Sequence, residues 1–192
     1  MSALSSSALC RRPLKNIDPR AGQSLIESCL VLAVVCLVLF GLFQISQLLA
    51  AKEVLLYSAG KAARAKTVGF NRFMVEKTVK VGTIPNAGRM TNPDPGGGPA
   101  LKHAMESARI PLYLAAENAG RLRAILEYAD WDSIGNPRIT SMGNGTLRVQ
   151  LSQDYPMRFP FYRLFYAADR VPLEADLSLD EHYPLYLDDW GW

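Results

Sequence analysis

The sequence predicts an α+β fold in which one long N-terminal helix is followed by an inserted helical segment and a small C-terminal antiparallel β-sheet. Three observations predict it. An uncharged, apolar run over residues 28–51 continues into an alanine-rich amphipathic stretch that ends near Val68. Residues 101–128 repeat apolar side chains with helical spacing, and two later segments alternate apolar and polar residues with the period of a strand. We therefore divide the chain into three parts: a leader (residues 1–22), a long helix (residues 23–69) and an α+β domain (residues 70–192).

The long helix is expected to begin near Ser24. The 24 uncharged residues 28–51 would extend about 36 Å at roughly 1.5 Å per residue, enough to cross the roughly 30 Å hydrocarbon core of a bilayer. Beyond the run, apolar residues recur every three or four positions at Leu48, Ala51, Leu55, Ala59 and Ala62. This spacing predicts an amphipathic continuation of the same helix.

The leader accounts for the net positive charge of the chain. The whole chain has 21 basic and 18 acidic residues, and removal of residues 1–22, with four basic residues and one acidic residue, leaves 17 of each. A neutral remainder gives no electrostatic reason to expect nucleic-acid binding. The leader is polar and contains two prolines, so we expect disorder there. Basic residues flank the apolar run on both sides, so charge bias alone does not set its orientation in a membrane.

After the long helix, residues 70–80 either extend it or form a strand. Proline and glycine mark 85–99 as an exposed loop without regular structure. Residues from about 100 to 130 should be helical with a joint at Pro111, which suits the first turn of a second helix. One apolar face is expected at Leu112, Ala115, Ala119, Leu122, Ile125, Leu126 and Ala129.

The rest of the chain, from about 137 to 182, reads as three strands. Residues 138–142 and 146–155 flank Gly143-Asn144-Gly145, a sequence that favours a tight hairpin turn. A third strand is expected over 171–182. Packing these strands on the amphipathic half of the long helix would bury both apolar faces.

Candidate catalytic or metal-binding sets are weak. Cys10 lies in the leader, while Cys29 and Cys36 lie within the apolar run, so the domain after the helix has no thiol. The two histidines, His103 and His182, fall in different elements, and we expect no catalytic residue, cofactor site or metal site. The aromatic stretch 155–166 is either a packed cover or an exposed binding surface, and the acidic tail 180–192 is expected to be solvated.

Residues 20–69 resemble the type IV pilin superfamily, and within it the TadE-like proteins of tight-adherence (Flp) pilus systems. The resemblance rests on Gly22-Gln23-Ser24-Leu25-Ile26-Glu27, on Leu39-Phe40-Gly41-Leu42-Phe43 and on the amphipathic stretch that follows. Gln23 stands where many pilins have an aromatic residue or methionine. Ser28 stands where the much shorter major Flp pilins have tyrosine, so the resemblance implies a minor pilin or pseudopilin.

The resemblance implies a function for three residues. A prepilin peptidase would cut between Gly22 and Gln23, and Glu27 would take part in subunit assembly by pairing with the new amino group of a neighbouring subunit. The expected partners are the bacterial inner membrane, other pilin-like subunits, the peptidase and the pilus assembly platform. The protein would cross the membrane once, with its N-terminus cytoplasmic and its C-terminal domain periplasmic, and would either stay there or enter an extracellular pilus.

Two alternatives remain open. The chain could be a type II secretion pseudopilin, which a calcium site in the β region would indicate. It could also be an uncleaved single-span membrane protein whose outer domain binds a partner. Glu27 also has a second interpretation, in which it simply lies at the headgroup level and stabilises the start of the helix.

Overall fold

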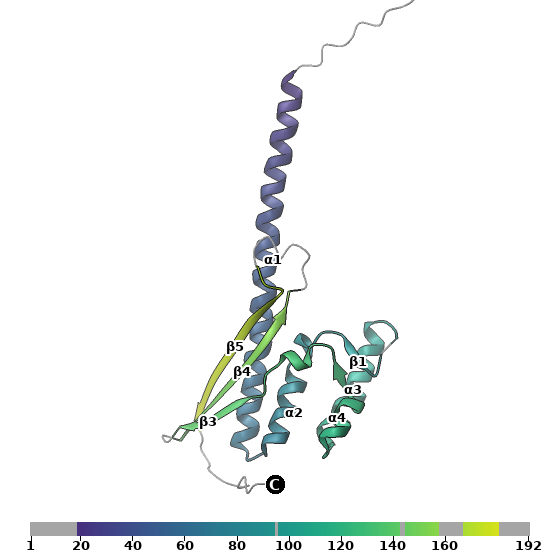
Figure 1. The fold of residues 1–192 in the computed structure, drawn as a ribbon, viewed down its shortest axis with the longest axis vertical. Coiled ribbons are helices and arrows are strands. Elements are labelled where there is room, and N and C mark those ends of the chain that lie inside the picture. Colours follow the sequence, from purple (N-terminus) through teal and green to yellow (C-terminus); the bar gives the residue numbers. More distant parts are fainter. Residues whose placement is uncertain (1–18, 95, 143–144, 158–166, 181–192) are drawn as a thin grey trace, which may run out of the picture. The chain divides into compact units, whose positions relative to one another are not determined.

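The computed structural model describes residues 19–94, 96–142, 145–157 and 167–180 (Figure 1). The elements run in the order α1, α2, η1, β1, α3, α4, β2, η2, β3, β4 and β5, which confirms the predicted α+β class. Residues 43–192 form one compact unit, and the part of α1 that precedes them belongs to another. The leader, the turn at 143–144, most of the aromatic stretch and the acidic tail after residue 180 lie outside the described residues.

Helix α1 extends over Pro19–Thr67 and so begins five residues before the expected start at Ser24. Proline is tolerated in the first turn of a helix, because the N–H that it lacks would have no intrahelical partner there. The predicted amphipathic continuation is confirmed: Ala51, Leu55, Ala59 and Ala62 are all buried. Gly69, two residues beyond the last helical residue, adopts a φ of 93° and so turns the chain out of the helix.

Residues 70–80 neither extend α1 nor form a strand, so both expectations for this segment were wrong. The N–H of Phe70 donates to the carbonyl of Ala65, which closes the end of α1, and a separate helix α2 then spans Arg72–Gly82. Asn71 caps α2, since its side-chain oxygen accepts a 2.9 Å hydrogen bond from the N–H of Met74. In the sequence, the glycine marks the end of one helix, and the asparagine two residues later marks the start of the next.

Helix α2 packs closely against the second half of α1. A Cβ atom added to Gly82 would lie 2.7 Å from Oγ of Ser58 and 3.3 Å from its Cα, so only glycine fits at this contact without movement. After α2 come the 3₁₀ turn η1, Ile84–Asn86, and the short strand β1, Met90–Asn92. The prediction that 85–99 lacks regular structure was therefore wrong for part of this range.

The inserted helical segment differs from the prediction in two ways. Helix α3, Pro99–Ala115, contains Pro111 in its interior, and the joint to α4, Ala119–Ile125, lies at residues 116–118. Pro111 is tolerated because it and Ser107, whose carbonyl loses its partner, are both exposed to water. The predicted apolar face is also broken, since Leu112 is 55% exposed whereas Leu126 is fully buried.

The helical segment also ends earlier than expected. Residues Glu127–Tyr128 form strand β2, which pairs antiparallel with β1, and the 3₁₀ turn η2, Trp131–Ser133, follows. This pairing joins residues far apart in sequence, so local periodicity does not reveal it.

The predicted three-stranded antiparallel sheet is confirmed. Strands β3 (Arg138–Met142), β4 (Thr146–Pro156) and β5 (Arg170–Asp180) lie in that order. The paired residues Val149 and Leu177 belong to the apolar face, and a Cβ on Gly60 of α1 would lie 3.7 Å from Cδ2 of Leu177. The sheet and the second half of α1 share one buried core.

Candidate assembly helix

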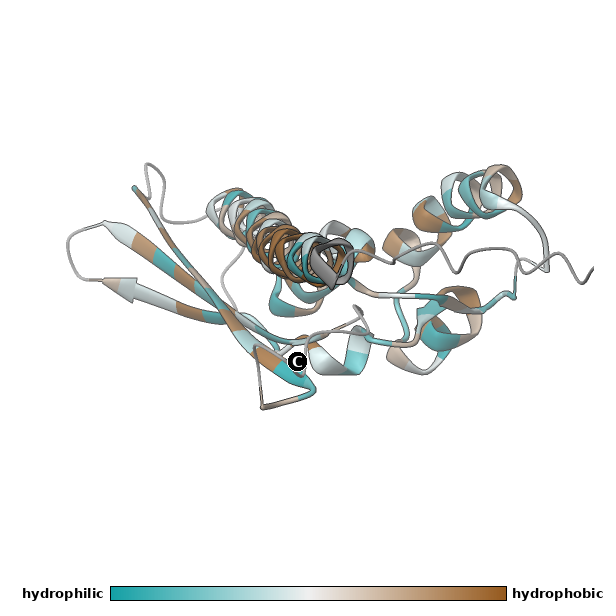
Figure 2. Cartoon of the chain, turned by 90° about the horizontal axis from the view of Figure 1, so that it is seen from above, coloured by the Kyte–Doolittle hydropathy of each residue, from teal (hydrophilic) through white to brown (hydrophobic). Residues whose placement is uncertain are grey.

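The first half of α1 differs from every other described element in its surface. Its large apolar side chains, from Leu25 to Leu42, are exposed around the whole helix, and Figure 2 shows the hydrophobic residues gathered along it. By length and composition, residues 23–67 contain enough continuous apolar helix to cross a membrane once. A helix that is apolar all round is stable in contact with lipid or with other helices, not with water.

The three predicted site residues lie at the start of this helix. The peptide bond between Gly22 and Gln23 falls within α1, and the side chains of Gln23 and Glu27 are exposed. Glu27 lies four positions after Gln23, which corresponds to about 6 Å along the helix axis, or one turn. The structure therefore brings the predicted cleavage site and the predicted assembly carboxylate close together on one element.

Glu27 is the only acidic side chain in the described part of α1 before Glu53. The residue after it, Ser28, satisfies its hydroxyl locally by donating a 2.9 Å hydrogen bond to the carbonyl of Ser24. A carboxylate at the edge of an apolar helix needs water, a proton or a cation, since transfer to hydrocarbon without one is costly.

Sequence reasoning missed Gln44, which lies in the apolar run. Its side chain is 2% exposed, and neither its Nε2 nor its Oε1 has a hydrogen-bond partner among the described residues. A glutamine inside an otherwise apolar run was the available signal, because buried amides normally have partners. Gln44 marks the position where α1 changes from exposed all round to buried on one face.

Sequence reasoning also missed Lys77 of α2, whose side chain is buried. Its ammonium group donates to the carbonyls of Leu114, at 2.6 Å, and Ala116, at 2.8 Å, which lie at the end of α3. Loss of solvation on burial lowers the pKa of Lys77, and the charge of Glu117 partly opposes this shift. The lysine thus satisfies carbonyls that a helix end leaves without partners.

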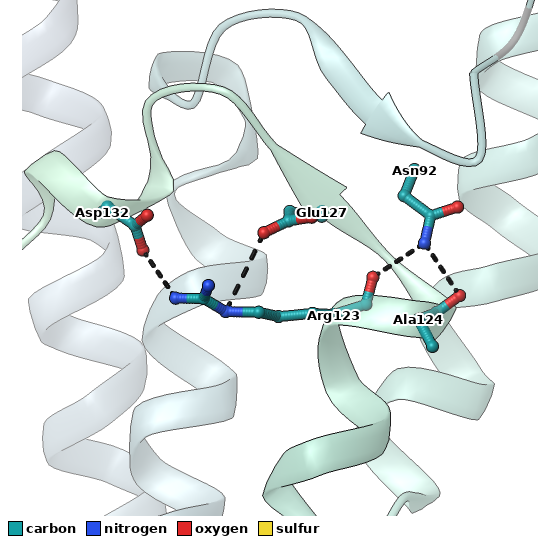
Figure 3. A network of polar contacts seen from close by, with 5 residues as sticks. All are labelled: Asn92, Arg123, Ala124, Glu127 and Asp132. Carbon is teal, nitrogen blue, oxygen red and sulfur yellow. Dashed lines mark hydrogen bonds and ion pairs between the residues drawn. The ribbon is translucent and has the colours of Figure 1, made fainter.

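A second polar network holds the region around α4 (Figure 3). The guanidinium of Arg123 lies 3.3 Å from the carboxylate of Asp132 and 3.8 Å from that of Glu127. The amide of Asn92 donates to the carbonyls of Arg123 and Ala124 at 2.9 and 3.2 Å. The first interaction joins α4 to β2 and η2, and the second joins α4 to β1, so the network holds α4 against the β1–β2 pair.

Among the described residues, no group of three histidine, cysteine, aspartate or glutamate side chains is placed to hold a metal ion. His103 is exposed on α3, and His182 lies outside the described residues, so the structure does not bring the two together. The exposed pair of Arg148 and Asp176 on the sheet is a salt bridge that raises the pKa of Arg148 and lowers that of Asp176.

Comparison with known protein families identifies the first helix. Residues 22–64 match the model of the TadE-like protein family. Over these residues α1 is similar to TadE-like proteins. The match begins at Gly22, includes Glu27 and ends near the last turn of α1, and it does not extend to the sheet or the inserted helices. No curated protein and no solved structure matches the chain.

Proposed function

We propose that this protein is a minor pilin or pseudopilin-like component of a tight-adherence pilus, with a structural and not an enzymatic role. The observation that carries the proposal is the coincidence of the TadE-like match with a helix whose apolar side chains are exposed on all sides. Such a helix needs a bilayer before assembly, and neighbouring helices can replace the lipid afterwards. The C-terminal domain would then lie on the periplasmic side of the inner membrane or on the filament surface.

In this function a prepilin peptidase cuts the bond between Gly22 and Gln23. The bond lies near the N-terminal end of α1, so residues 19–22 must unwind before a peptidase can bind them in an extended form. Proline and glycine both have low helix propensity, and the first turn contributes few hydrogen bonds, so this unwinding costs little. Cleavage makes Gln23 the first residue and creates an amino group one turn from Glu27.

The new amino group and Glu27 carry opposite charges at the apolar end of the helix. Pairing between neighbouring subunits lets each charge satisfy the other where water is scarce. The pair would set the axial position of one helix against the next, because any other position leaves a charge unpaired.

Mass spectrometry of the protein extracted from membranes tests the cleavage step. In cells with an active prepilin peptidase, we expect the N-terminus at Gln23, and in cells without the peptidase we expect the intact leader. An intact leader in both strains would reject processing and would favour an uncleaved single-span membrane protein.

Substitution of Glu27 tests the assembly step. We expect Glu27→Ala and Glu27→Gln to be inserted and cut normally but to lose co-purification with other pilin-like subunits. Glu53→Gln, an exposed glutamate on the same helix, is the matched control. Normal co-purification of both Glu27 variants would rule out charge pairing. Calcium-dependent protection of the β-sheet from proteolysis would instead favour a type II secretion pseudopilin.

A further inference from the structure

The C-terminal domain contains a cavity of about 200 Å³ between α2, α4 and η2. Aromatic rings of Phe73, Tyr113 and Trp131 line it, and the ring centroids of the last two are 5.4 Å apart. Sites for drug-sized ligands enclose roughly 300–1,000 Å³, so this volume suits a single amino-acid side chain better than a cofactor.

The acidic groups that line the cavity already have cationic partners. The carboxylate of Glu76 lies 3.0 Å from the guanidinium of Arg72, and the carboxylates of Glu127 and Asp132 share the guanidinium of Arg123 (Figure 3). The acids therefore leave little negative charge available to an occupant.

The two lysines that line the cavity form no ion pair with a carboxylate among the described residues, and the charge of Glu117 acts on Lys77 only at longer range. The ammonium of Lys77 donates to two carbonyls, which leaves one of its three N–H donors, and lies 4.6 Å from the ring centroid of Phe73. The ammonium of Lys80 lies 5.9 Å from the ring centroid of Trp131. The charge that the cavity can offer an occupant is thus positive and lies beside the aromatic rings.

We propose that this cavity is the docking site for an acidic peptide segment of a partner protein, which packs one aromatic side chain against the rings of Phe73 and Trp131 and places an adjacent carboxylate at Lys80 and Lys77. Aromatic anchors in small desolvated pockets carry most of the energy in many protein interfaces, and a charged neighbour fixes their orientation. This site lies outside the TadE-like match, so the proposal stands independently of the function assigned to the first helix.

The indole N–H of Trp131 supplies a reporter for occupancy. The atom is shielded from water and has no acceptor among the described residues. An occupant that shifts the ring slightly and offers an oxygen would change the environment of this N–H strongly. Its NMR resonance can be assigned by its loss in Trp131→Phe.

The test uses the full chain in neutral detergent micelles and a fluorescein-labelled, amidated pentapeptide with one tryptophan between two aspartates, followed by fluorescence anisotropy. We expect saturable binding that moves the Trp131 indole resonance. Lys80→Gln should weaken binding about tenfold, as expected for loss of one charge-assisted contact. Lys52→Gln, an exposed lysine on α1, should bind as the wild type does. Circular dichroism checks that each variant is folded.

Two control peptides separate the contributions. Replacement of both aspartates by asparagine should weaken binding to the level of Lys80→Gln, and replacement of the tryptophan by alanine should abolish it. The proposal is overturned by absence of binding, by equal binding of the asparagine peptide, or by equal weakening in Lys52→Gln. Self-association of the protein in the micelles that the peptide reverses would assign the cavity to a second copy of the chain and would also overturn the proposal.

Discussion

The side-chain amide of Asn86 donates a 2.8 Å hydrogen bond to the main-chain carbonyl of Ala51, inside the core. The same amide group lies 3.1 Å from Oε1 of Gln153 on β4. One buried side chain of η1 thus joins α1 to the sheet. Each of these polar groups is shielded from water, so each depends on the others for its hydrogen bonds.

We expect Asn86→Ala to lower the free energy of unfolding by about 2–4 kcal/mol, because it leaves Gln153 and the Ala51 carbonyl without a donor in the core. Thermal or denaturant unfolding in detergent micelles measures this. Asn136→Ala, at an exposed position, should change stability by less than about 0.5 kcal/mol. In a double-mutant cycle, the variant that carries both Asn86→Ala and Gln153→Ala should lose less free energy of unfolding than the two single variants lose in sum. Additive losses would show that the two amides do not act together.

Lys77→Met should destabilise the protein by about 1–3 kcal/mol, because the carbonyls of Leu114 and Ala116 lose their donor while remaining partly buried. Methionine retains most of the apolar stem, so the loss of stability measures the contribution of the ammonium group. Lys80→Met, one turn along α2 and with no side-chain hydrogen bond to the described residues, is the matched control. Hydrogen exchange of amides in α3 and α4 should increase in Lys77→Met alone. Equal stability of the two variants would contradict the proposed role of Lys77 at the end of α3.

Gln44→Leu should raise the free energy of unfolding by about 1–2 kcal/mol, because it removes two buried polar atoms that lack partners and keeps a similar volume. Gln47→Leu, in the next turn and more exposed, should change stability little. Destabilisation by Gln44→Leu would mean that the amide has a partner outside the described residues. Unfolding in micelles of fixed composition provides the comparison.

The protein should lose stability at alkaline pH through two buried tyrosines. Burial raises the pKa of Tyr113 to about 12. Burial also raises the pKa of Tyr128, together with its 2.6 Å hydrogen bond to Glu106. In the unfolded chain both phenols ionise near pH 10, as free tyrosine does. The folded protein therefore holds protons that the unfolded chain has lost, so this stability is complete below pH 10 and falls as pH rises toward 12.

Lys77 acts in the opposite direction, because its lowered pKa makes the folded protein release a proton before the unfolded chain does. Rising pH removes the stability contributed by two tyrosines and adds that of one lysine, so the net effect at alkaline pH is a loss of stability. Melting temperatures measured between pH 8.5 and 11.5 should fall steeply above pH 10 in the wild type and less steeply in Tyr113→Phe. An unchanged slope in Tyr113→Phe would contradict the assignment.

The confirmed elements are those whose signal is local. The stripe at Ala51, Leu55 and Ala59 predicted the buried face of α1, since a helix returns a side chain to the same face every three or four residues. The alternation of apolar and polar residues around Val149 and Leu177 predicted β4 and β5, because successive side chains of a strand point to opposite faces of the sheet. The apolar run and the motif around Gly22 and Glu27 predicted the similarity to TadE-like proteins that the family comparison finds over residues 22–64.

The errors occurred where neighbouring elements override local preference. Pro111 reads as a helix start, yet α3 continues through it because the carbonyl left without a partner faces water. Glu127 and Tyr128 continue a helical pattern, yet they pair with β1, about 36 residues earlier in the chain. The spacing of apolar residues along the sequence gives no sign of the contact between β1 and β2.

The sequence by itself determined the membrane-length helix, its amphipathic continuation and the hairpin, because each depends on residues a few positions apart. The tertiary structure alone decided that Lys77 is buried at the end of α3, that Asn86 joins α1 to β4, and that two lysines lie beside aromatic rings in one cavity. The physical reason is that a polar side chain takes its role from the groups that replace water around it. Those groups come from other elements of the fold.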